Sequence, residues 1–225
     1  MTRIGEGRGP DGKDPIGERS EIATMKKTSE ALEQCRQTIQ SYEGCADRYY
    51  ARIPEMPNPR DQAALRRIAE MAGDGGLILE VGSGPGREAD FLETLGVTVR
   101  RTDATRRFLE LQAARGKHGA LLNIVTDDLG GPYDAVVGLC VLIHVPRDRI
   151  DHVLAKVAGS LRPGASFLVS MREGDGETVG KFHTVYWRRD AFAVRLEQAG
   201  LTVLWDEFSI DPDGDPWNTF LAVKP

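Results

Sequence analysis

The sequence predicts an α/β protein built on a doubly wound, mostly parallel sheet. From residue 77 onward, short apolar runs alternate with segments of helical periodicity, which is typical of parallel strands covered by helices on both faces. The first apolar run, residues 77–81, passes through the glycine-rich stretch VGSGPGR directly into a helical segment. The last two apolar runs are joined only by DPDGDP, which is too short for a crossover and predicts an antiparallel hairpin.

The N-terminal region differs from the rest in composition. Glycine, proline and charge dominate residues 1–20, which predicts a disordered tail. Residues 21–51 are polar with sparse apolar side chains, which follow helical steps of three or four from Leu32 to Tyr49 and predict a helix. IPEMPNPR then breaks the helix as a linker. We therefore expect three parts: a tail over residues 1–20, a helical segment with its linker over residues 21–59, and a core domain over residues 60–225.

The core domain should begin with a helix over residues 60–72 and then alternate strands with helices. The segment 170–187 has no regular period and is expected to be a loop of the kind that carries specificity in such folds. The expected strands are residues 77–81, 97–103, 119–125, 133–145, 166–171, 201–210 and 217–224, and the expected helices are residues 87–95, 105–115, 147–161 and 188–199.

Composition and charge exclude several classes of protein. The net charge of −5, from 29 basic and 34 acidic residues, argues against a general nucleic-acid binder, which usually presents a basic face. No stretch approaches the roughly 18 consecutive apolar residues that a membrane span needs, and the N-terminus lacks the apolar core of a secretory signal. We therefore expect a cytoplasmic protein, a monomer or a homodimer, without a membrane or nucleic-acid partner.

The three cysteines, Cys35, Cys45 and Cys140, are scattered and form no CxxC pair. That spacing argues against a disulfide scaffold or a zinc ribbon, so we expect reduced thiols and no metal site. Cys140 lies within the apolar run AVVGLCVLI and is interpreted most simply as a small buried apolar residue.

The glycine stretch stands where a doubly wound sheet holds a ligand, between the first strand and its helix. It lacks the GxxxxGK[ST] of a P-loop, and its G-x-G-x-G spacing differs from the G-x-G-x-x-G of dinucleotide folds. Asp103 ends the second strand 21 residues after Gly82, where a carboxylate can accept hydrogen bonds from both hydroxyls of a ribose. The alternative is that Asp103 only caps the following helix.

The stretch 79–105 resembles the first two motifs of the class I S-adenosylmethionine-dependent methyltransferases of small-molecule type. Its sequence is LEVGSGPGREADFLETLGVTVRRTDAT. The family's fourth-strand motif, its helix and the R-P-G before strand five resemble residues 133–171. The resemblance covers roughly residues 40–225 and implies a Rossmann-like, seven-stranded sheet with the hairpin at one edge. It also implies S-adenosyl-L-methionine as the cofactor, bound across strands one to four.

The resemblance assigns cofactor roles to residues at the strand ends, with the glycine turn against the methionine part and Asp103 against the ribose. The family usually holds the adenine amino group with an Asp at the end of strand three, whereas this chain has Asn123, followed by Asp127 and Asp128. We prefer Asn123 with Ile124, and the two aspartates are the alternative. The implied cofactor-binding residues are Tyr42, Glu80, Gly82, Ser83, Gly84, Gly86, Asp103, Ala104, Thr105, Asn123, Ile124, Leu139 and Cys140.

His144 is the candidate general base, because it follows GLCVLI at the mouth where the family's cofactor and acceptor meet. The alternative is that His144 stacks on the cofactor or holds the following VPRD turn. SYEGCADRYY resembles the family's Y-x-x-x-A-x-x-Y lid, which implies Tyr42 over the cofactor and Tyr49 as a catalytic residue near the transferred methyl. The candidate substrate residues are Arg172, His183 and Tyr186.

The sequence thus predicts an enzyme that transfers a methyl group from S-adenosylmethionine to an O or N atom of a small molecule, such as a secondary metabolite. Methyl transfer is an in-line displacement, so the protein chiefly aligns the reacting atoms and excludes water. Two alternatives stay open: a tRNA or protein methyltransferase with the same core, and a non-catalytic scaffold that keeps the fold.

Overall fold

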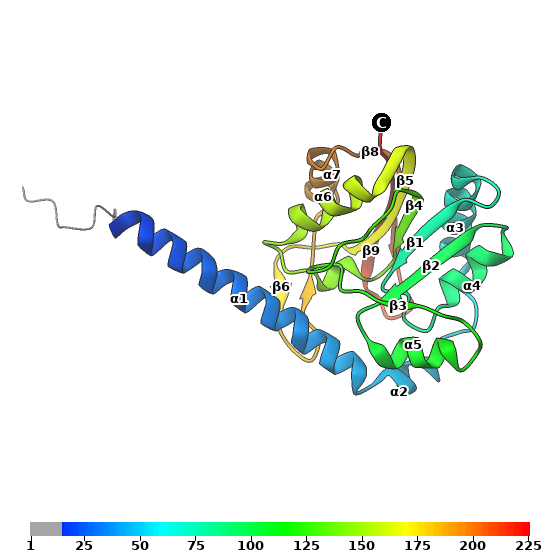
Figure 1. The fold of residues 1–225 in the computed structure, drawn as a ribbon, viewed down its shortest axis with the longest axis horizontal. Helices are drawn as coiled ribbons and strands as arrows, with labels where there is room; N and C mark the ends of the chain where they lie inside the picture. Colours follow the sequence, from blue (N-terminus) through cyan, green and yellow to red (C-terminus); the bar gives the residue numbers. More distant parts are fainter. Residues whose placement is uncertain (1–14) are drawn as a thin grey trace, which may run out of the picture.

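The computed structural model describes the backbone of residues 15–225 and the side chains of residues 29–225, and it confirms the predicted sheet (Figure 1). Seven strands form one sheet in the order β3-β2-β1-β4-β5-β9-β8. The first five run parallel, and β9 lies antiparallel between β5 and β8 as the predicted hairpin. The strands of this sheet are β1 (Leu77–Val81), β2 (Thr98–Asp103), β3 (Ala120–Leu121), β4 (Tyr133–Gly138), β5 (Leu161–Arg172), β8 (Thr202–Ile210) and β9 (Pro216–Val223).

Helices cover both faces of the sheet (Figure 1). Buried side chains of α3 and α4 form one core with one face, and those of α6 and α7 form a second core with the other. The helices are α1 (Pro15–Glu43), α2 (Ala46–Tyr50), α3 (Pro59–Ala72), α4 (Arg87–Thr94), α5 (Arg106–Ala113), α6 (Ile150–Ser160) and α7 (Arg189–Gln198), with one 3₁₀ turn, η1 (Leu142–His144).

The strand β1 shows why the central strands are continuous apolar runs. Ile78 packs in the core of α3 and α4, whereas Leu79 and Val81 pack in the core of α6 and α7, so neither face of the strand meets water. A strand buried on both faces has no need for alternating polar residues. The glycine stretch follows β1 directly and therefore lies beyond the carboxyl ends of the parallel strands.

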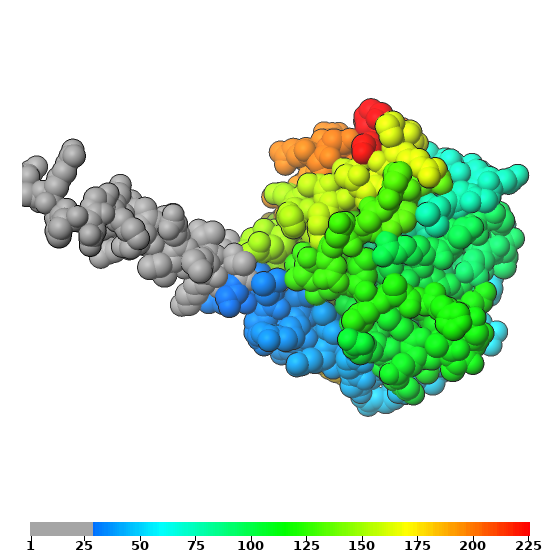
Figure 2. Space-filling view, viewed as in Figure 1, coloured from blue at the N-terminus to red at the C-terminus, as the bar shows by residue number. Residues whose placement is uncertain are grey.

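The N-terminal segment was predicted as one helix over residues 21–51, and this prediction was wrong at Gly44 and Cys45. The chain turns there between α1 and α2. The carboxylate of Glu43, the last residue of α1, accepts hydrogen bonds from the backbone amides of Arg106 and Arg107, at 2.7 and 3.1 Å, and so caps α5. Figure 2 shows this end of α1 in blue against the green elements of the core. The expected tail lies outside the described residues except for residues 15–20, which open α1.

The apolar run 133–145 was predicted as one long strand, but β4 ends at Gly138. Cys140 has a φ of 57°, and its backbone N–H donates to Ser170 Oγ at 2.8 Å, which turns the chain out of the sheet. The rest of the run stays apolar because Leu142 and Val145 fold back into the core. The run 119–125 is likewise strand only at Ala120 and Leu121, and the expected loop 170–187 contains a small hairpin of β6 (Glu177–Thr178) and β7 (Thr184–Val185).

Candidate active site

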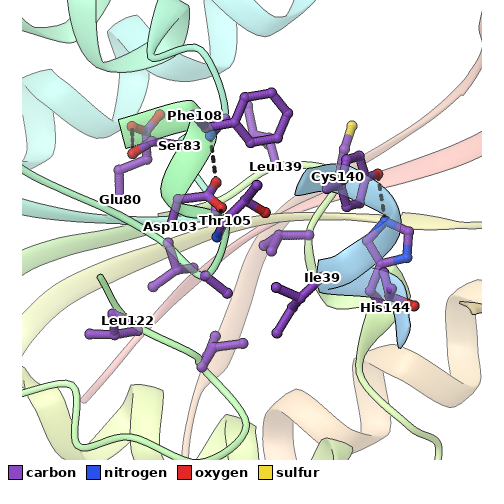
Figure 3. A pocket seen from close by; sticks show the side chains of 18 of the residues that line it. Ile39, Glu80, Ser83, Asp103, Thr105, Phe108, Leu122, Leu139, Cys140 and His144 are labelled. Carbon is purple, nitrogen blue, oxygen red and sulfur yellow. Dashed lines mark hydrogen bonds between the residues drawn. The ribbon is translucent and has the colours of Figure 1, made fainter. Parts of the chain in front are cut away.

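A cavity lies at the carboxyl ends of β1, β2 and β4, beneath the end of α1 and α2 (Figure 3). Most of the residues that the sequence singles out line it together. They are Tyr42, Tyr49, Glu80, Gly82, Ser83, Gly84, Asp103, Ala104, Thr105, Asn123, Ile124, Leu139, Cys140 and His144. A single enclosure therefore joins residues from the lid, the glycine turn and three strand ends.

The glycine turn exposes its backbone to this cavity. Gly82 has a φ of 66°, and a Cβ there would lie 2.4 Å from Val141 Cγ2, so no other residue fits without displacing the wall. Gly84 lines the cavity, and a Cβ on it would meet no atom within 4 Å. The turn thus leaves open space directly against the main chain, as a close-fitting ligand requires.

Three side chains hold the turn from behind. Gln112 Nε2 donates to the carbonyl of Gly84 at 2.8 Å, and an Arg115 guanidinium N–H donates to the carbonyl of Pro85 at 2.5 Å. Arg101 donates to the carbonyl of Gly86 at 3.2 Å, which places Gly86 behind the turn and outside the lining. Because all three carbonyls are bound on the outer side, the turn is preorganised without a ligand.

Arg101→Met is expected to lower the free energy of unfolding by about 2 kcal/mol. The Arg101 side chain is 2% exposed and lies 2.8 Å from Asp90 and 2.7 Å from Glu93, whose side chains are about 30% exposed and so partly solvated. Urea unfolding measures the change, with the exposed Arg106→Met as control. Equal stability of the two variants would show that the buried guanidinium stabilises nothing.

Asp103 anchors the turn from the neighbouring strand. Its carboxylate accepts hydrogen bonds from the backbone amides of Gly84 and Thr105, both at 2.7 Å. Burial raises the pKa of Asp103 in spite of these donors. Asp103 therefore both caps the start of the next segment and presents its carboxylate oxygens to the cavity, so the two readings of this residue are compatible (Figure 3).

Glu80 is buried below the turn, and its carboxylate accepts a hydrogen bond from the Ser83 hydroxyl. Burial is the main cause that raises its pKa from 4.5 to about 8, with nearby Glu88 adding to it. A carboxyl held in this way binds its proton more tightly in the folded state than in the unfolded state. Stability conferred by the protonated form is therefore lost as the pH rises towards 8.

Glu80→Gln is expected to flatten the pH dependence of stability between pH 5 and pH 8, roughly the window between the two pKa values of Glu80. Urea unfolding of the protein without cofactor at several pH values measures this, with Glu110→Gln as the control because that side chain is 62% exposed. Parallel pH curves for wild type and Glu80→Gln would contradict the expected shift.

Asn123 and Ile124 reach the cavity, whereas Asp127 and Asp128 are exposed outside it. Asn123 Oδ1 accepts from the backbone amide of Val125 at 2.9 Å, and Asp127 in turn accepts from the amide of Asn123 at 2.9 Å. Asp127 thus supports the turn that presents Asn123 and does not itself line the cavity.

His144 is held by two hydrogen bonds. Its Nδ1 lies 2.6 Å from the carbonyl oxygen of His183 and its Nε2 lies 2.9 Å from Tyr42 Oη. A carbonyl only accepts, so Nδ1 carries the proton, and Nε2 of the neutral ring accepts from the Tyr42 hydroxyl. Burial lowers the pKa of His144 and raises that of Tyr42, which keeps both groups neutral.

None of the candidate substrate residues lines the cavity. Arg172 pairs with Asp215 at 2.5 Å and lies over the ring of Trp217, and Tyr186 lies outside the lining. His183 is buried with its Nε2 3.0 Å from Glu177, so its contribution is the backbone carbonyl that orients His144. Cys140, expected to be buried, is instead exposed and lines the cavity, because its positive φ turns it out of the strand.

The cavity residues that sequence reasoning missed include Asp61, Arg87, Glu88 and Phe108. Arg87 and Glu88 directly follow the glycine turn, and that position could have indicated them. The ring of Phe108 contacts the rings of both Tyr42 and Tyr49, with centroids 5.9 and 5.6 Å away. No local sequence pattern predicts this contact. Among the described residues, no group of His, Cys, Asp and Glu could hold a metal ion, and no helix is long and apolar enough to cross a membrane.

A sequence model of the methyltransferase domain family matches residues 79–167, which contain the glycine turn, Asp103, Asn123 and His144. Over these residues the chain therefore carries a methyltransferase domain. No curated protein matches the sequence of the chain.

Solved structures share the fold of this chain at low sequence identity. The 1,6-didemethyltoxoflavin-N1-methyltransferase of Burkholderia thailandensis, crystallised with 1,6-didemethyltoxoflavin and S-adenosylhomocysteine, is 18% identical with a TM-score of 0.67, over 88% of this chain and 89% of its own. The CcbJ methyltransferase of Streptomyces caelestis is 18% identical with a TM-score of 0.62, over 75% of this chain and 97% of its own. The magnesium protoporphyrin IX methyltransferase of Synechocystis, with bound SAM, is 16% identical with a TM-score of 0.59, over 73% and 79%.

Proposed function

We propose that this methyltransferase transfers a methyl group to an O or N atom of a small molecule. The observation that carries the proposal is the cavity itself, which is walled by strand ends and roofed by Tyr42 and Tyr49 of the lid. An acceptor inside such an enclosure is shielded from water, which suits a small molecule. The Burkholderia enzyme of similar fold was crystallised with a small-molecule acceptor, which supports the same class here.

The residues present fit S-adenosylmethionine. The open space at Gly84 suits the methionine part, the Asp103 carboxylate suits the ribose hydroxyls, and the amide of Asn123 beside Ile124 suits the adenine edge. When bound, the cofactor supplies a methyl group on a positively charged sulfur. The chain's own residues position the acceptor against it and keep water out.

His144 and Tyr42 provide a route for the acceptor's proton. The Tyr42 hydroxyl already donates to His144 Nε2, so an acceptor O–H or N–H that donates to Tyr42 Oη completes a chain of hydrogen bonds that ends on the imidazole. The His183 carbonyl accepts from Nδ1 and stabilises the ring as it becomes positively charged. Tyr49, whose ring lies 6.2 Å from that of Tyr42, covers the same space.

Two measurements test the proposal. Isothermal calorimetry is expected to show S-adenosylhomocysteine binding to the wild-type protein, and a screen with methyl-labelled cofactor against phenols, amines and carboxylates is expected to label a small molecule. A protein that binds no S-adenosylhomocysteine would contradict the proposed enzyme and favour a scaffold. Labelling of tRNA or protein alone would contradict the small-molecule acceptor.

The division into a tail over residues 1–20, a lid with its linker over residues 21–59 and a core over residues 60–225 stays a prediction. So do the compartment, the lack of a nucleic-acid partner and the choice between monomer and homodimer. We include the lid in the proposal because Glu43, Tyr42 and Tyr49 all contact α5 of the core.

A further inference from the structure

One end of the cavity is lined by charged side chains that the proposed cofactor contacts do not use: Asp61, Arg87 and Glu88. Arg87 Nε donates to Glu88 Oε1 at 2.5 Å, and Asp61 Oδ2 accepts from Asn58 Nδ2 at 2.6 Å. The guanidinium is therefore already paired with a carboxylate. With one cation and two carboxylates, this end carries an excess of negative charge when all three are ionised.

Asp61, one of the three charged residues, lies on α3, which packs against β4 and β5. Arg60, the neighbour of Asp61, pairs with Glu207 of β8 at 3.0 Å. In the sheet, Glu207 lies opposite Thr219 of β9, and Thr219 lies opposite Ser170 near the carboxyl end of β5. Ser170 in turn accepts from the amide of Cys140 at the end of β4. Asn123 follows β3, four strands away from β5 in the sheet order, which corresponds to roughly 19 Å at the usual strand spacing. Asp61 is thus remote from the proposed adenine site, whereas Arg87 and Glu88 directly follow the glycine turn at the end of β1.

The lining of this end suits an organic cation. Burial raises the pKa of both Asp61 and Glu88, because their charged forms are poorly solvated. A bound cation would stabilise these charged forms in place of the missing water. Tyr49, a residue that is 42% exposed, lines the same cavity as Arg87 and Glu88. A carboxylate and an aromatic face are the two groups that recognise a protonated amine. An anionic acceptor would meet two carboxylates and a guanidinium that Glu88 already occupies.

We propose that Asp61 and Glu88 bind a protonated amine of the acceptor, with the ring of Tyr49 beside it. The inference rests on the proposed function and narrows its substrate class to small molecules that carry a basic amine. Arg87 then acts as a positioning residue, because its bond to Glu88 fixes that carboxylate at the cavity wall.

The test uses three probes with one ring and different side chains: tyramine, 4-ethylphenol and 3-(4-hydroxyphenyl)propionate. Each is titrated by calorimetry into the full-length protein saturated with S-adenosylhomocysteine. We expect tyramine to bind at least tenfold more tightly than the other two. Asp61→Asn and Glu88→Gln should each remove most of that preference, whereas Asp128→Asn, which changes an exposed carboxylate outside the cavity, should leave it intact.

The affinity for S-adenosylhomocysteine itself separates the outcomes. We expect it to stay within about twofold of wild type in Asp61→Asn and Glu88→Gln. A parallel loss of S-adenosylhomocysteine affinity would overturn the inference and assign these carboxylates to the cofactor's own amino group. Weak or equal binding of tyramine to the wild-type complex would also overturn it, while leaving the methyltransferase assignment intact. Failure of wild type to bind S-adenosylhomocysteine would instead contradict the proposed function.

Discussion

Asp103→Ala is expected to weaken S-adenosylhomocysteine binding by roughly 30- to 160-fold, which corresponds to about 2–3 kcal/mol for charge-assisted hydrogen bonds. The substitution removes the carboxylate proposed to bind the ribose. It also frees the amide of Gly84, which Asp103 holds at 2.7 Å, so the glycine turn loses an anchor at the same time. Calorimetry with S-adenosylhomocysteine measures the change directly, without knowledge of the acceptor.

Two companion variants separate these effects. Asp103→Asn keeps an oxygen for the Gly84 amide but loses the negative charge, and it should fall between wild type and Asp103→Ala. Asp127→Ala changes an exposed carboxylate that only supports the Asn123 turn and should cost less than tenfold. If Asp103→Ala bound S-adenosylhomocysteine like wild type, Asp103 would be a structural cap and nothing more.

The parts of the fold that the sequence predicted well are those with strong local signals. β1 matches its apolar run, α3 begins at Pro59 behind the cap residue Asn58, and the DPDGDP turn produces the β8–β9 hairpin. β4 was predicted too long because apolar character reports burial and not conformation. Leu142 and Val145 are as buried in and beside a 3₁₀ turn as they would have been in a strand.

The site residues divide in the same way, into those that a local sequence signal indicates and those placed by contacts between distant segments. Residues at or just beyond strand ends, such as Asp103 and Gly84, could be placed at the cavity because the carboxyl ends of parallel strands lie on one side of the sheet. The supports of the glycine turn, such as Gln112, could not, because each contact joins segments far apart in sequence. His183 was singled out for its imidazole, yet its backbone carbonyl makes the contact with His144.

Helix α5 connects the lid to the glycine turn. At its start it receives the Glu43 carboxylate of α1, and Phe108 on its first turn contacts both lid tyrosines. At its end Gln112 binds the carbonyl of Gly84. Since one short helix makes both sets of contacts, we expect docking of the lid and order in the glycine turn to be coupled through it. Ligand affinity should therefore depend on lid contacts that never touch the ligand.

His144→Ala is expected to lower kcat by about 100-fold, the lower end of the range for loss of a general base, with S-adenosylhomocysteine affinity changed by less than about threefold. The acceptor for this measurement is the molecule that the labelled screen identifies. Tyr42→Phe should also lower kcat, because it removes the hydroxyl that links the cavity to Nε2. Tyr50→Phe, which removes the hydroxyl of an exposed tyrosine on the same helix α2 but outside the cavity lining, serves as the control. A loss confined to cofactor binding would mean that His144 only packs the site.

The pH profile tests the same role independently. A base must be unprotonated to act, and burial lowers the pKa of His144 below its usual 6.5. Activity should therefore be constant above that value and fall only at lower pH, as the ring gains a proton and can no longer accept from Tyr42. In His144→Ala this acid limb should disappear from kcat/KM. If it persisted unchanged, the titrating group would be another residue, and the hydrogen-bonded chain through Tyr42 would not carry the proton.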